Sequence, residues 1–142
     1  MSSVVKWLQL GFIPRNVDLG LLVLRVALGV QMLYGHGWEK FMTFAEKSAT
    51  FPDPMGVGPK VSLGLAVFGE VVCAGLLALG LFTRAAAVAL IVTMGVAFFA
   101  VHKGALSGPQ SGEMAFLYLV GFTAIFLAGP GQYSIDAQMG GG

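Results

Sequence analysis

The stretch that decides the fold is Val61–Phe82, VSLGLAVFGEVVCAGLLALGLF, in which Glu70 is the one charged residue. About 20 apolar residues in a helix cross the ~30 Å hydrocarbon core of a bilayer, so this run is long enough to span a membrane. A carboxylate near the middle of such a span costs roughly 2.5–3.5 kcal/mol even on the lenient insertion scale. Glu70 therefore needs a polar partner or a function.

The composition of the whole chain extends this interpretation to a membrane protein. Of the 142 residues, 56% are hydrophobic and 11% are charged, and the mean hydropathy is +0.82. The charged share is less than half of the roughly 25% found in soluble domains, so the chain cannot cover itself with a polar surface. The net charge of +1 comes with no basic patch for nucleic acid, and the single cysteine, Cys73, excludes an intrachain disulfide. We expect one integral membrane domain over residues 1–142.

The chain contains three further apolar runs, one before Val61–Phe82 and two after it. The expected spans are residues 19–42, 61–82, 84–101 and 113–128. Helices are favoured because lipid offers the backbone no hydrogen-bond partner, and the runs lack the alternation of a membrane β-barrel. Thr83 alone separates the second and third spans, which predicts a tight hairpin, and Asp18 is the expected N-cap of the first span. The predicted fold is all-α: an antiparallel bundle of four transmembrane helices.

Four spans place both termini on one side of the membrane. The cationic residues of the terminal side are Lys6, Arg15 and Arg84, and those of the opposite side are Lys40, Lys47, Lys60 and Lys103. Three against four does not settle the orientation by the positive-inside rule, but Lys6 and Arg15 flank the first span and favour cytoplasmic termini. Residues 4–12 are either a short interfacial segment anchored by Trp7 or a flexible tail.

Arg25, in the first span, is the candidate partner of Glu70. With a rise of 1.5 Å per residue, Glu70 lies roughly 16 Å and Arg25 roughly 9 Å from the terminal-side face. The difference of about 7 Å is close to the reach of an arginine side chain, so a buried ion pair is expected. The pair would either fix the packing of the bundle or provide a proton-accepting carboxylate or a hook for a polar headgroup. A protonated, unpaired Glu70 is the remaining alternative.

A second polar layer is expected at the opposite face. Its members are His36, Trp38, Lys40, His102 and Glu113. Histidine can relay protons near neutral pH or bind a quinone carbonyl. The two histidines also suit a bis-histidine haem, and together with Glu113 a metal ion. Interfacial residues that face water are the simpler interpretation, and no metal ligand is assigned.

The order of these motifs resembles the DoxX family of small four-span membrane proteins. The matching motifs are LGLLVLRVALG (19–29), HGWEK (36–40), GEVVCAGLLALGLFTR (69–84), His102 and GPGQYSID (129–136). The resemblance covers about residues 18–136. It implies a four-helix bundle in a prokaryotic inner (plasma) membrane. The family-like polar positions are Arg25, His36, Trp38, Lys40, Glu70, Arg84, His102 and Asp136.

The resemblance also implies a link to quinone chemistry, because the family takes its name from a subunit associated with a terminal quinol oxidase. We therefore expect an accessory subunit that docks a larger oxidoreductase and presents a quinone or a small reductant. The chain has no flavin, haem or iron–sulfur motif, so it is not expected to be catalytic alone or to hold a covalent cofactor. The alternatives are a structural anchor or assembly subunit, and a proton or small-solute pathway in a homo-oligomer.

Overall fold

Within residues 2–141, which the computed structural model describes, every regular element is a helix. The α-helices are α1 (Ser3–Leu8), α2 (Val17–Met32), α3 (Trp38–Met42), α4 (Phe44–Lys47), α5 (Pro59–Val67), α6 (Ala74–Leu79), α7 (Thr83–Gly95), α8 (Glu113–Ala128) and α9 (Ile135–Gln138). The π-helical segments in this part of the chain are η1 (Leu33–Gly37), η2 (Phe68–Cys73) and η3 (Val96–Val101). Each η segment continues an α-helix, so the chain folds into a few long rods.

Three of the helices among residues 2–141 are long and apolar enough to cross a membrane: Val17–Met42, Pro59–Leu79 and Thr83–Val101. They correspond to the first three predicted spans, and the all-helical membrane character is confirmed. Helix α8 is apolar but has 16 residues, fewer than the about 20 that a perpendicular span needs. Its role as a fourth span, and with it the antiparallel four-span bundle, stays a prediction.

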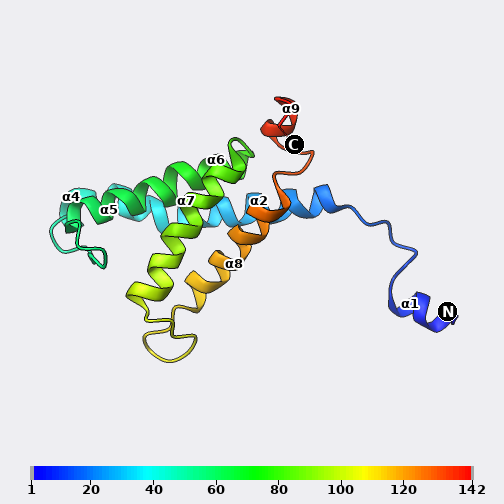
Figure 1. Cartoon of the computed structure of the whole chain (residues 1–142), viewed down its shortest axis with the longest axis horizontal. Coiled ribbons are helices and arrows are strands. Elements are labelled where there is room, and N and C mark those ends of the chain that lie inside the picture. Colours follow the sequence, from blue (N-terminus) through cyan, green and yellow to red (C-terminus); the bar gives the residue numbers. More distant parts are fainter. Residues whose placement is uncertain (1, 142) are drawn as a thin grey trace.

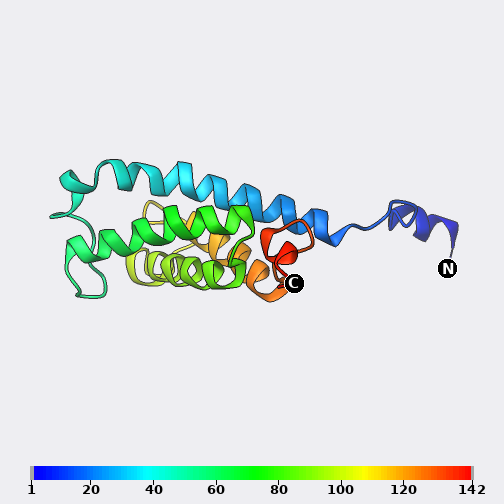
Figure 2. The same cartoon turned by 90° about the horizontal axis from the view of Figure 1, so that it is seen from above.

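The long helices form two pairs. Helix α2 packs on α6, and α7 packs on α8. Figure 1 shows α7 and α8 crossing α2 obliquely, and Figure 2 shows α2 running beside the α5–η2–α6 helix. In both views α1 lies away from the other helices, beyond the start of α2. Trp7 on α1 is exposed, and its contact with a membrane surface stays a prediction.

The core lies where α2, α6, α7 and α8 meet. Leu77, Leu90 and Phe122, from α6, α7 and α8, are fully buried. Van der Waals packing between such side chains holds membrane helices together, because lipid tails are as apolar as the core. The core therefore holds the two helix pairs together.

Two predicted helix ends are wrong. The second long helix ends at Leu79 rather than Phe82, because Gly80 adopts a left-handed conformation with φ +71°. Gly80 N–H donates to Leu77 O and Leu81 N–H to Leu76 O, which closes the helix as a Schellman motif. Thr83 is the first residue of α7, so the hairpin turn is residues 80–82.

The N-cap of α2 is Asn16 rather than the predicted Asp18. Asn16 Oδ1 accepts a hydrogen bond from Leu19 N–H at 2.9 Å. Asp18 lies in the first turn of α2, where its carboxylate accepts from Gln132 N–H at 3.1 Å. It therefore ties the segment after α8 to the start of α2.

Candidate functional site

Arg25 binds the carbonyl groups at a helix end and does not pair with Glu70. Its guanidinium is buried, and Nη1 donates to Ala78 O at 2.7 Å and to Leu77 O at 3.2 Å, while Nη2 donates to Tyr133 O at 2.6 Å. The last carbonyls of a helix lack partners within the helix and carry partial negative charge. Arg25 supplies both the donors and the charge at the end of α6. The predicted Arg25–Glu70 ion pair is therefore wrong.

Asp136 caps the opposite side of the same turn. Its carboxylate accepts from Phe82 N–H and Thr83 N–H, both at 2.8 Å, and its own N–H donates to Gly80 O at 2.8 Å. Although burial raises the pKa of Asp136, the hydrogen bonds from Thr83 and Phe82 and the charge of Arg25 lower it on balance. Arg25, Gly80 and Asp136 form a turn clasp that fastens the C-terminal segment to the helix hairpin.

Arg84, the other family-like residue on the terminal side, also holds a helix end. Its Nε donates to Phe126 O at 3.1 Å, and its guanidinium carbon lies 4.7 Å from the centre of the Phe126 ring. Phe126 belongs to the last turn of α8. The contact combines a hydrogen bond to a helix terminus with a cation–π interaction, which indicates a structural role.

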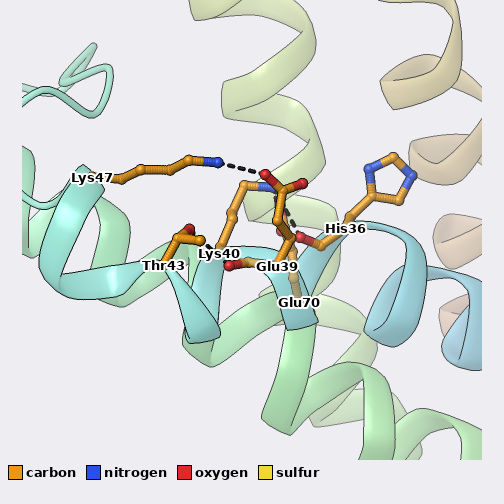
Figure 3. A network of polar contacts seen from close by, with 6 residues as sticks. All are labelled: His36, Glu39, Lys40, Thr43, Lys47 and Glu70. Atoms are coloured by element: carbon orange, nitrogen blue, oxygen red, sulfur yellow. Dashed lines mark hydrogen bonds and ion pairs between the residues drawn. The ribbon is translucent and has the colours of Figure 1, made fainter.

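Glu70 pairs with Lys40 (Figure 3). Lys40 Nζ lies 2.7 Å from Glu70 Oε2 and donates a second, longer hydrogen bond of 3.4 Å to His36 O. The Glu70 side chain is only 7% exposed, and that of Lys40 is 25% exposed. The negative charge of Glu70, in the middle of the helix Pro59–Leu79, is thus compensated by Lys40, near the end of the helix Val17–Met42.

A close backbone contact brings this pair together. A Cβ added at Gly37 would lie 2.5 Å from Glu70 O, so only glycine lets η1 approach η2 this closely. Lys40 is three residues beyond Gly37 on the same helix, which places its side chain on the same face, beside the Glu70 carboxylate. Glu70 lies in η2 and Gly37 in η1. Such π-helical turns are frequent at functional sites.

An exposed ion pair lies outside the buried one. Lys47 Nζ is 2.5 Å from Glu39 Oε1, and both side chains are exposed. Figure 3 shows both ion pairs around α3, which carries Glu39 and Lys40.

A pocket of about 300 Å³ lies against the Lys40–Glu70 pair. It is lined by Lys40, by Phe51, Pro52, Pro54, Met55 and Val57 of the α4–α5 loop, by Ser62, Leu65 and Ala66 of α5, by Glu70 of η2, and by Val92, Thr93, Val96, Ala97 and Val101 of α7 and η3. Ser62 Oγ already donates to Asp53, and Thr93 Oγ1 to Ala89 O. The ion pair is therefore the main polar feature of an apolar wall. The volume is at the lower end of the roughly 300–1,000 Å³ typical of ligand pockets.

The two histidines of the predicted second layer lie apart from the pocket lining. The His36 ring points away from Lys40 and Glu70 in Figure 3 and packs edge-on against Tyr118, with 5.5 Å between ring centres. His102 Nδ1 lies 3.1 Å from Gln110 O and so holds the loop before α8. Among residues 2–141 there is no group of three or more His, Cys, Asp or Glu side chains that could hold a metal ion.

Two further members of the predicted second layer, Trp38 and Glu113, also lie outside the pocket lining. Trp38 is exposed and lies between Tyr34 and Phe41, with ring centres 6.5 and 5.7 Å away. Glu113 is exposed at the start of α8, where its N–H bonds Ser111 Oγ. Of the predicted second layer, only Lys40 lines the pocket. Ser62, Thr93 and the α4–α5 loop are pocket residues that sequence reasoning missed.

Comparison with known proteins places the chain in a family without naming an activity. The chain is 37% identical over 110 residues to an uncharacterized protein of Haemophilus influenzae, an alignment that covers 71% of this chain and 77% of that protein. No solved structure gives a significant match. The family match labelled DoxX covers residues 20–103, more than half of the chain, and includes Arg25, Lys40 and Glu70. On these grounds the chain belongs to the DoxX family.

Proposed function

We propose that this protein is a membrane accessory subunit of a quinone-linked oxidoreductase and that the pocket beside Lys40 and Glu70 holds the quinone ring. The observation that supports this proposal is a largely apolar cavity with one charged pair in its wall. Ligand pockets typically combine apolar walls with a few polar groups that fix orientation. A quinone ring with two carbonyl oxygens has the matching chemistry.

The polar pair suits both redox forms of such a ligand. The Lys40 ammonium has three N–H donors, of which two are directed at Glu70 Oε2 and His36 O. The third can donate to a quinone carbonyl. Lys40 binds only Oε2 of Glu70, so Oε1 can accept a hydrogen bond from a quinol hydroxyl. In this proposal the partner enzyme carries out the electron transfer.

Quinone titration of the purified protein in lipid nanodiscs tests the proposal. Saturable binding of a decyl-substituted benzoquinone is expected for the wild type. Ala66→Leu should abolish it, because the larger side chain fills a pocket that Ala66 lines. Val23→Leu on the exposed face of α2 is the matched control and should bind like the wild type. Absence of saturable binding in the wild type, alone and with co-purified partners, would refute the proposal.

The turn clasp favours a second candidate function, that of a non-catalytic anchor. Arg25 and Asp136 direct their hydrogen bonds at helix ends and at the C-terminal segment. If the whole set of polar residues serves folding, a partner enzyme that co-purifies with the Ala66→Leu variant from native membranes should keep its quinone reductase activity. Loss of the partner enzyme's quinone reductase activity in that variant would instead favour the first candidate.

A further inference from the structure

The pocket lies in a gap between two helices that diverge. Helix α7 packs on α6 and η2, whereas α5 packs mainly on η2 and α3. Figure 1 shows α7 leaving the α5–η2–α6 helix after the turn that joins them. Leu65 of α5 and Val92 of α7 line the pocket from its two sides, and each is 60% exposed. Both belong to helices long and apolar enough to span a membrane, so a mouth of the pocket between these two side chains would open to lipid.

The α4–α5 loop covers another side of the pocket. Phe51, Pro54 and Met55 of this loop all line it. Asp53 fastens the loop to the start of α5, since its carboxylate accepts from Val57 N–H at 3.0 Å, Gly58 N–H at 2.8 Å and Ser62 Oγ at 2.8 Å. The loop joins α4 to α5 and is flanked by Lys47 at the end of α4 and Lys60 at the start of α5. The loop therefore lines the pocket at the end where these two lysines lie.

From these two features we infer that the ligand enters from the bilayer between α5 and α7, while the Asp53-fastened loop excludes water-borne molecules. The inference rests on the proposed function and narrows its ligand class. A small water-soluble reductant has no direct path to the pocket. A lipid-dissolved amphiphile passes between Leu65 and Val92, with its polar ring directed at Lys40 and its alkyl chain left in the lipid.

Two groups of variants separate the lipid route from the aqueous route. Leu65→Phe and Val92→Phe, alone and combined, narrow the mouth. Asp53→Ala releases the loop without touching the mouth or the ion pair. Val88→Phe is the matched control, because Val88 is exposed on α7 one turn before Val92 and does not line the pocket. The probes are a decyl-substituted benzoquinone and a benzoquinone sulfonate without an alkyl chain, whose charge keeps it in water, both added to nanodiscs and followed by stopped flow.

Entry from lipid predicts that the combined mouth variant slows association of the decyl-substituted probe about tenfold. Dissociation should slow as well, whereas ordinary contact mutations act mostly by speeding dissociation. Asp53→Ala should leave that rate unchanged but admit the probe without an alkyl chain.

Suppose that the wild type binds the decyl-substituted probe, that the mouth variants associate with it at the wild-type rate, and that Asp53→Ala associates faster. This result would overturn the lipid route and leave the proposed function standing. No saturable binding in the wild type would overturn the proposed function itself, and the inference with it. If Val88→Phe slows association as much as Val92→Phe, the effect is not specific to the mouth, and the lipid route is likewise rejected.

Discussion

Lys40 Nζ lies 2.7 Å from Glu70 Oε2, but the two side chains are not equally buried: the carboxylate side chain is 7% exposed and the lysine side chain 25%. Without its partner, lysine can extend its long stem toward water, whereas the glutamate is held inside the helix packing. The two residues should therefore respond differently when their partner is removed.

Lys40→Met should destabilise the protein more than Glu70→Gln. Removing the lysine leaves a buried carboxylate without a counter-charge, a loss of about 3 kcal/mol. Removing the glutamate charge leaves a lysine that can reach water, a loss of about 1 kcal/mol. Unfolding free energies measured by SDS titration in mixed micelles test this order. Lys47→Met, which breaks the exposed pair with Glu39, is the control and should change little. A larger loss for Glu70→Gln would contradict the assignment.

Gly37→Ala should separate η1 from η2. The added Cβ would lie 2.5 Å from Glu70 O, which is backbone and cannot move aside alone. Overpacking of this kind costs about 1–3 kcal/mol. Gly64→Ala on α5 is the control, since its Cβ would have no neighbour within 4 Å, and it should be neutral or stabilising by about 0.5–1 kcal/mol. Equal thermal stability of the two variants would show that the helices do not depend on this contact.

Sequence reasoning located the helices but not the partner of Glu70. Breakers such as the FPDPMGVGPK stretch at 51–60 and Gly129-Pro130-Gly131 bound the apolar runs, so long helices were predictable. Depth along a span gives the position of a residue's backbone but not the direction in which its side chain extends. Side chains on a helix lean toward its N-terminus. Arg25 and Glu70 lie on antiparallel helices, and so their side chains diverge, one toward the end of α6 and the other toward Lys40.

The pocket could not be predicted, because its position depends on features without a sequence period. The segments η1, η2 and η3 widen single turns and shift the faces of their helices. The regular helical spacing used to read amphipathic faces does not reveal such turns. The divergence of α5 from α7 follows from tertiary packing, so Ser62 and Thr93 appear in the sequence as ordinary small polar residues.

Arg25→Met should lower stability without altering quinone affinity. It removes the donors to Leu77 O, Ala78 O and Tyr133 O, and unsatisfied buried carbonyls cost about 1–3 kcal/mol each. The pocket does not include Arg25, so the folded protein should bind quinone with the wild-type Kd. Lys40→Met should weaken binding instead. Thermal unfolding and quinone titration of both variants give the comparison. A weakened Kd in Arg25→Met at a temperature where it is folded would place Arg25 in the binding site after all.

The turn clasp should make stability depend on pH in the acid range. The pKa of Asp136 in the folded protein is below its ordinary value of 3.8, despite a burial effect in the opposite direction. The unfolded chain therefore binds more protons than the folded one near that value, so the contribution of Asp136 is complete at neutral pH and is lost as pH falls through the folded-state pKa. The difference in Tm between the wild type and Asp136→Asn should be constant above about pH 5 and shrink below about pH 4. Tm values measured in detergent from pH 3 to 7 test this. A difference that stays constant or grows toward low pH would mean that the ionised carboxylate does not hold the turn.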